Sequence, residues 1–144
     1  MQHILVLCIG NICRSPMGEA MLRMALPGKT VRSAGLGALI GKPADPLAVQ
    51  LMAEQNVDIT EHRAQLISLT MVTQADLILV MDFEQKRHVE THYMSARGKV
   101  FRLGEAAKAD IPDPYREGID NFRIAHKMID KGATFWAAQI LRMN

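Results

Sequence analysis

The most informative part of the chain is residues 3–16, which read HILVLCIGNICRSP. The first six of these form an almost unbroken apolar run, which is typical of a strand buried on both faces of a parallel sheet. Gly10 and Asn11 interrupt that run. Ser15-Pro16 then predicts a helix start, with Ser15 as the N-cap and Pro16 at the first helical position. We therefore expect a strand, a short loop and a helix.

Strand-like and helix-like segments alternate along the rest of the chain. Glycine-rich or proline-rich stretches separate them, and one long helix is expected to close the chain, with an interruption at Gly132 left open. Strands that alternate with helices predict an α/β fold of three layers, in which a four-stranded parallel sheet is flanked by helices. The expected strands are residues 3–8, 30–34, 75–81 and 99–103, and the expected helices are residues 15–26, 47–55, 68–74, 83–91 and 119–142.

Length and composition predict a single domain over residues 1–144. The chain is 49% hydrophobic and 22% charged, which suits a globular core, and its net charge of +2 gives no reason to expect nucleic-acid binding. No apolar run is long enough for membrane insertion, and no secretory leader precedes Ile4. A cytoplasmic location is therefore expected. With only two cysteines and no ligand-spaced His pair, neither a metal nor a cofactor is expected.

Residues 8–15 carry a Cys-x5-Arg-Ser pattern between the strand and the helix. A loop of this length can turn its backbone N–H groups inward as an anion nest, and a helix N-terminus adds its positive end. Arg14 can hold two phosphate oxygens at once. The same positive field favours the thiolate of Cys8, which could attack a bound phosphorus atom. The alternative is that Cys8 only fills the core, as apolar-flanked cysteines often do.

The remaining loop residues suit the same purpose. Gly10 permits close backbone approach to an anion or a positive φ, and Asn11 tolerates left-handed geometry and can pin the loop. Ser15 can donate a hydrogen bond to the sulfur. Ligands of parallel α/β folds lie beyond the carboxyl ends of the strands, where Cys8 is expected. The expected position of Cys8 favours a functional role over a role in filling the core.

Residues 8–16 closely resemble the phosphate-binding loop of the low-molecular-weight protein tyrosine phosphatases. Further likenesses are Ser33-Ala34-Gly35, Leu79 to Asp82 and Asp113-Pro114-Tyr115. The resemblance implies Cys8 as the nucleophile, Arg14 as the phosphate and transition-state binder, and Asp113 as the general acid. It further implies that Ile9, Gly10, Asn11, Ile12 and Cys13 complete the phosphate loop, with Asn11, Ser15 and Ser33 supporting it.

Two Asp-Pro pairs compete for the role of the acid that protonates the leaving group. Asp45-Pro46 is interpreted as a helix start, and Asp-Pro pairs commonly begin turns. From the residues alone the two are nearly equivalent. The Tyr that follows Asp113-Pro114 and the family resemblance decide for Asp113, with Tyr115 flanking the substrate ring.

The sequence predicts less specific roles for Cys13, Asp82 and the histidines. Cys13 could form a reversible disulfide with Cys8, as the resemblance suggests, or simply pack within the loop. Asp82 is expected to anchor local structure. The histidines at positions 3, 62, 88, 92 and 126 are expected to be surface or packing residues, since none pairs convincingly with Cys8.

Two departures from the animal members concern the substrate pocket. The loop from Leu36 to Gly41 lacks an aromatic residue, so Leu36 or Leu39 could line the pocket instead. Arg116 stands where a second Tyr would follow Tyr115. Both segments are similar to the bacterial members that are encoded with exopolysaccharide or capsule machinery, which act on the tyrosine-rich tail of a membrane tyrosine autokinase. By this analogy the partner is a phosphotyrosine protein of that kind.

Three rival functions share parts of this pattern. An arsenate reductase of the same fold needs further redox cysteines after Cys13, and the chain has none. A protein-arginine phosphatase of the same family resembles this chain but carries Thr at the position of Ile12, which favours tyrosine here. A silent phosphopeptide-binding module would need neither the thiol of Cys8 nor the carboxyl of Asp113.

Overall fold

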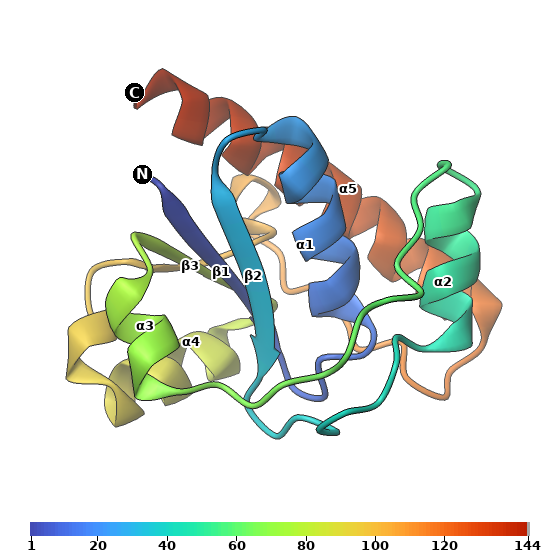
Figure 1. The fold of residues 1–144 in the computed structure, drawn as a ribbon, viewed down its shortest axis with the longest axis horizontal. Helices are drawn as coiled ribbons and strands as arrows, with labels where there is room; N and C mark the ends of the chain where they lie inside the picture. The colour runs from blue at the N-terminus through green and yellow to red at the C-terminus, as the bar shows by residue number, and fades with distance from the viewer. Residues whose placement is uncertain (144) are drawn as a thin grey trace.

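A computed structural model describes residues 1–143, and its four strands form one parallel sheet (Figure 1). The strands are β1 (His3–Cys8), β2 (Thr30–Gly35), β3 (Leu77–Val80) and β4 (Val100–Arg102). Their order is β2-β1-β3-β4, and every neighbouring pair is parallel. The order reverses beside β1, so the loop that follows β1 opens at the switch point where ligands of such sheets bind.

Helices cover both faces of the sheet. Figure 1 shows α1, α2 and α5 on one side of the strands, with α3 and α4 on the other. The three-layer α/β architecture predicted from the sequence is confirmed. The helices are α1 (Arg14–Ala25), α2 (Pro46–Ala53), α3 (Leu69–Gln74), α4 (Phe83–His92) and α5 (Ile119–Arg142), and short 3-10 turns occupy Met94–Ala96 and Glu105–Ala107.

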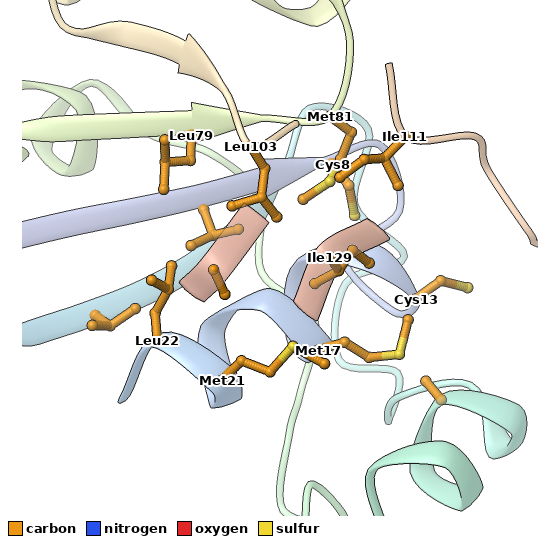
Figure 2. Packing of buried hydrophobic residues seen from close by; sticks show 14 of the residues in the cluster. Cys8, Cys13, Met17, Met21, Leu22, Leu79, Met81, Leu103, Ile111 and Ile129 are labelled. Carbon is orange, nitrogen blue, oxygen red and sulfur yellow. The ribbon is translucent and has the colours of Figure 1, made fainter. Parts of the chain in front are cut away.

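Strand β1 is buried on both faces, because its alternate side chains enter two separate cores. Ile4, Val6 and Cys8 pack with α1 and α5, whereas Leu5 and Leu7 pack on the α3–α4 side. Figure 2 shows the first of these cores, where Cys8 lies among apolar side chains from the sheet and from α1 and α5. Each fully buried Val or Leu side chain contributes about 1.5–3 kcal/mol by leaving water. This burial fixes the position of the loop that begins at Cys8.

The start of α1 differs from the sequence prediction. The helix begins at Arg14 with Cys13 at the N-cap, so Ser15 is not the cap and Pro16 is not the first helical residue. No side chain caps the helix. Instead, the backbone N–H of Ser15 points at the Cys8 Sγ, at 3.4 Å, so the thiol takes the place of a capping oxygen.

Helix α5 runs without a break through Gly132, which resolves the question left open by the sequence. A Cβ at Gly132 would lie 2.5 Å from the Leu103 carbonyl oxygen and 2.9 Å from the Leu103 Cγ. The glycine therefore serves close packing against the end of β4 and does not interrupt the helix. Among residues 1–143, no helix combines the length and apolarity that crossing a membrane requires.

Candidate active site

The loop between β1 and α1 turns its carbonyl oxygens away from its centre. Five consecutive carbonyls, from Cys8 to Ile12, each accept a hydrogen bond from another segment. The donors are the backbone N–H groups of Leu36, Gly37, Leu39 and Asp45 and the ring of His62, at 2.7–3.0 Å. Because a peptide N–H points opposite to its carbonyl, the loop amides face inward. In the described chain, the N–H groups of residues 9–13 have no protein acceptor. This is the geometry of an anion nest.

The segment after β2 holds the loop in this orientation. Gly35 has no side chain because a Cβ there would overlap the Ile9 carbonyl oxygen. Leu36, Gly37 and Leu39 then donate to the Cys8, Ile9 and Gly10 carbonyls. The glycine-rich character of residues 35–41 thus serves close approach of two backbones.

The thiol of Cys8 receives donors at the floor of this loop. Its Sγ lies 2.9 Å from the Ser15 hydroxyl and 3.4 Å from the Ser15 backbone N–H. Both residues are buried. The sulfur therefore lies against two hydrogen-bonding groups of Ser15.

Asn11 fixes the direction of these hydrogen bonds. Its Oδ1 accepts the backbone N–H of Gln65 at 2.9 Å, so its amide nitrogen must donate on the other side. That nitrogen donates to the hydroxyls of Ser15 at 2.7 Å and Ser33 at 3.0 Å. The Ser15 hydroxyl, which accepts from Asn11, is then free to donate to Cys8. As expected from its residue type, Asn11 is left-handed, with a φ of 59°.

A second layer of polar residues braces Asn11, of which the sequence predicted Ser33 but not Glu19, His62 or Gln65. The Ser33 hydroxyl donates to Glu19 at 2.9 Å, and the His62 Nε2 lies 2.7 Å from the Asn11 carbonyl oxygen. His62 and Gln65 lie more than 50 positions from Asn11 in the chain, with no motif around them, so no pattern pointed to them.

Arg14 connects the loop to the segment that carries Asp113. Its side chain is almost fully buried, and one guanidinium nitrogen donates to the Ile111 carbonyl oxygen at 2.8 Å. A second nitrogen lies 3.7 Å from the Asp113 carboxylate, which is half exposed. The structure therefore brings together Cys8, Arg14 and Asp113, which line one pocket of about 160 Å³.

The segment before Asp113 is fastened to the end of β4. The Arg102 guanidinium binds the Asp110 carboxylate at 3.1 Å and lies 3.8 Å from the centre of the Phe83 ring. Ile111 then donates its N–H to the Met81 carbonyl at 2.8 Å. Asp113 thus follows a segment that hydrogen bonds hold in place at Asp110 and at Ile111.

Cys13 lines the same pocket as Cys8 but differs in chemistry. Burial raises the pKa of the Cys13 thiol far above its ordinary value, and the nearby Asp45 carboxylate raises it further, against the opposing effect of Arg14. Cys13 therefore stays a neutral thiol at neutral pH. Both cysteines are unbridged in the structure, and a redox role for Cys13 stays a prediction.

The other predicted residues separate into pocket and support. Leu39 and Tyr115 line the Cys8 pocket, whereas Leu36 lines a neighbouring groove. Gly10 does not adopt a positive φ, and a Cβ there would meet its neighbours at an ordinary 3.8 Å. Asp45 and Asp82 accept hydrogen bonds as the N-caps of α2 and α4.

The amino-acid sequence matches the profile of the low molecular weight phosphotyrosine protein phosphatase family over residues 3–144. The chain belongs to this family. It is 53% identical over 137 residues to the probable low molecular weight protein-tyrosine-phosphatase EpsP of Ralstonia nicotianae, covering 95% of this chain and 94% of EpsP. The solved structure of Vibrio vulnificus Wzb in complex with benzylphosphonate is 43% identical, with a TM-score of 0.92 over 96% of this chain and 98% of Wzb.

A family member of different specificity shares the fold equally well. The YwlE arginine phosphatase from Geobacillus stearothermophilus has a TM-score of 0.92 over 99% of this chain and 95% of YwlE, at 28% identity. The family and the enzyme class predicted from the sequence are confirmed, but the fold does not by itself separate tyrosine from arginine substrates. Within residues 1–143, no group of three or more His, Cys, Asp and Glu side chains is arranged to hold a metal ion.

Proposed function

We propose that this phosphatase hydrolyses phosphotyrosine in proteins through a covalent phosphocysteine on Cys8. The supporting observation is the loop itself, whose unpaired N–H groups face inward around the Cys8 sulfur. These N–H groups and Arg14 hold the three terminal oxygens of the phosphate. The Cys8 sulfur then lies next to the phosphorus atom, on the side opposite the phosphorus–oxygen bond that breaks.

In the first step, the Cys8 thiolate attacks phosphorus and the bond to the tyrosine oxygen breaks. Asp113, protonated at this stage, gives its proton to that oxygen, so tyrosine leaves as a neutral phenol. In the second step, Asp113 takes a proton from water, the water oxygen attacks phosphorus, and the phosphorus–sulfur bond breaks. Phosphate is released and the thiolate returns, stabilised by the Ser15 hydroxyl.

Ile12 and the pocket walls support tyrosine as the substrate. Leu39 and Tyr115 flank the opening above Cys8 and offer apolar contact to an aromatic ring. The alternative substrate is phosphoarginine, as in YwlE. The likeness to EpsP and Wzb supports a role in exopolysaccharide production. The proposed target is the tyrosine-rich tail of a membrane autokinase. We place this reaction in the cytoplasm and assign it to a single domain over residues 1–144.

Hydrolysis of matched peptides carrying phosphotyrosine, phosphoserine or phosphoarginine tests the substrate class. We expect turnover of phosphotyrosine only, and its loss in the Cys8→Ser variant, because a serine hydroxyl is a far weaker nucleophile than a thiolate. Preferential release of phosphate from phosphoarginine would replace the tyrosine assignment. Undiminished turnover by Cys8→Ser would remove Cys8 from the mechanism.

A further inference from the structure

A second hollow continues from the Cys8 pocket and is not used by the reaction. This hollow, the α4 groove, has a volume of about 740 Å³ and shares Ile9, Arg14, Gly37 and Asp113 with the Cys8 pocket. One wall is formed by Arg87, His88 and His92 of α4, and Ile9 and Leu36 line it as well. A polypeptide whose phosphotyrosine enters the Cys8 pocket would place neighbouring residues in this groove.

The carboxylates of the α4 groove are already engaged by donors. Asp82 caps α4 by accepting the Gln85 N–H at 2.8 Å, and Asp110 is bound by Arg102. Asp113 faces Arg14 and accepts the Tyr115 N–H at 3.1 Å. Glu84 is the exception among the acidic lining residues, since no donor in the described chain binds its side chain. Of these carboxylates, Asp110 and Asp113 therefore face an arginine side chain.

Two side chains of α4 that line the groove carry donors without a partner in the described chain. Arg87 is exposed and makes no hydrogen bond or ion pair with any residue in the range 1–143. His88 and His92 stack with their ring centres 4.0 Å apart, and the His92 Nδ1 donates to the His88 carbonyl oxygen at 2.8 Å. Gln85, which is 3% exposed, also lines the groove, and its Nε2 is a buried donor without an acceptor.

The unpaired guanidinium of Arg87 favours an acceptor or an anion as its ligand. We infer that the α4 groove binds an anionic side chain of the substrate protein, a carboxylate or a second phosphate, a few residues from the phosphotyrosine, with Arg87 as its main contact. Ile9 and Leu36 supply apolar contact to the same segment. This inference rests on the proposed function, because it deepens the substrate class of that site.

Phosphotyrosine peptides that differ at one flanking position test the inference. Glu, Gln, Lys or a second phosphotyrosine is placed at each of three positions on either side, and kcat/KM is measured for each peptide. We expect at least one position where Glu or phosphotyrosine is about two- to fivefold better than Gln, as for an exposed ion pair. Arg87→Ala removes the preference, and Arg87→Glu transfers it to Lys.

Two controls keep the outcomes distinct. Lys127→Ala removes one positive charge from an exposed position of α5 and should preserve the preference. Neither Lys127→Ala nor Arg87→Ala should alter turnover of nitrophenyl phosphate, which does not reach the groove. Equal kcat/KM for Glu and Gln at all positions, or a preference that survives Arg87→Ala, overturns the inference while leaving the phosphatase intact. Failure to hydrolyse any phosphotyrosine peptide overturns the proposed function and the inference together.

Discussion

Single side chains determine how the Cys8 sulfur is held. The Gln65 N–H fixes the orientation of the Asn11 amide, and that amide in turn leaves the Ser15 hydroxyl free to donate to sulfur. A buried donor or acceptor that loses its partner costs about 1–3 kcal/mol, so each link of this chain resists rearrangement. The thiolate-binding geometry therefore exists before any substrate arrives.

Asp113→Asn should slow the reaction most for substrates with poor leaving groups. An amide cannot supply the proton that a phenolate needs, whereas nitrophenolate is stable enough to leave without one. We expect kcat for phenyl phosphate to fall by about 10²-fold or more, and kcat for nitrophenyl phosphate to fall much less. Equal losses on the two substrates would exclude Asp113 as the general acid.

The residues proposed to carry the chemistry were predictable because they share one short motif or follow from family resemblance. Cys8, Asn11, Arg14 and Ser15 lie within eight positions of one another. The braces at Glu19, His62 and Gln65 were not predictable, because tertiary folding alone brings these positions to the loop. The same is true of the Ile111 carbonyl, since a backbone acceptor leaves no trace in the sequence.

Helix α5 packs closely against the end of β4. Gly132 allows the α5 backbone to approach the Leu103 carbonyl, and the Trp136 Nε1 donates to the Arg102 carbonyl at 3.1 Å. These contacts fix the strand end from which the Asp113 segment begins. The sequence showed the glycine but not its reason, because a helix interior gives no sign of what packs against it.

Gly132→Ala should destabilise the fold although alanine is the better helix former. The helix gains about 1 kcal/mol from propensity, whereas overpacking against the Leu103 backbone costs about 1–3 kcal/mol. Urea unfolding should show a lower midpoint for Gly132→Ala. The matched reverse change, Ala138→Gly at an exposed α5 position, should lose only about 1 kcal/mol. A more stable Gly132→Ala protein would contradict the packing account.

The start of α1 shows why element boundaries were harder to predict than elements. Ser15-Pro16 is a common helix-start pair, yet here α1 begins at Arg14. The first-turn N–H groups are directed at the Cys8 thiol and at the space for an anion, so no capping side chain is needed. The proposed anion site therefore explains why the helix start departs from the usual capping pattern.

At the scale of the whole molecule, the sheet lies between two layers of helices. One partly buried group between two of these helices, His126, is expected to make the stability depend on pH. His126 of α5 lies 3.0 Å from the Gln55 side-chain oxygen, near the end of α2. Burial lowers the pKa of His126 below its ordinary value of 6.5, despite the nearby Asp130 and Glu54 carboxylates. The folded protein therefore holds this imidazole neutral.

His126 should make the protein less stable in mild acid. Because the folded pKa lies below the unfolded pKa of 6.5, the unfolded chain takes up a proton first as the pH falls. The stabilisation is complete above that value and is lost below it. Between about pH 7.5 and pH 5.5, wild type should lose more unfolding free energy than His126→Gln. Identical losses in the two proteins would exclude His126 as the cause.

The covalent step on Cys8 is tested by quenching the enzyme in acid during turnover of a phosphotyrosine peptide labelled on phosphate. Digestion and mass spectrometry then locate any phosphate on the protein. We predict one phosphate on Cys8 in the wild-type enzyme and none in Cys8→Ala. Turnover with no phosphate bound to the protein, or phosphate on another residue, would contradict the mechanism.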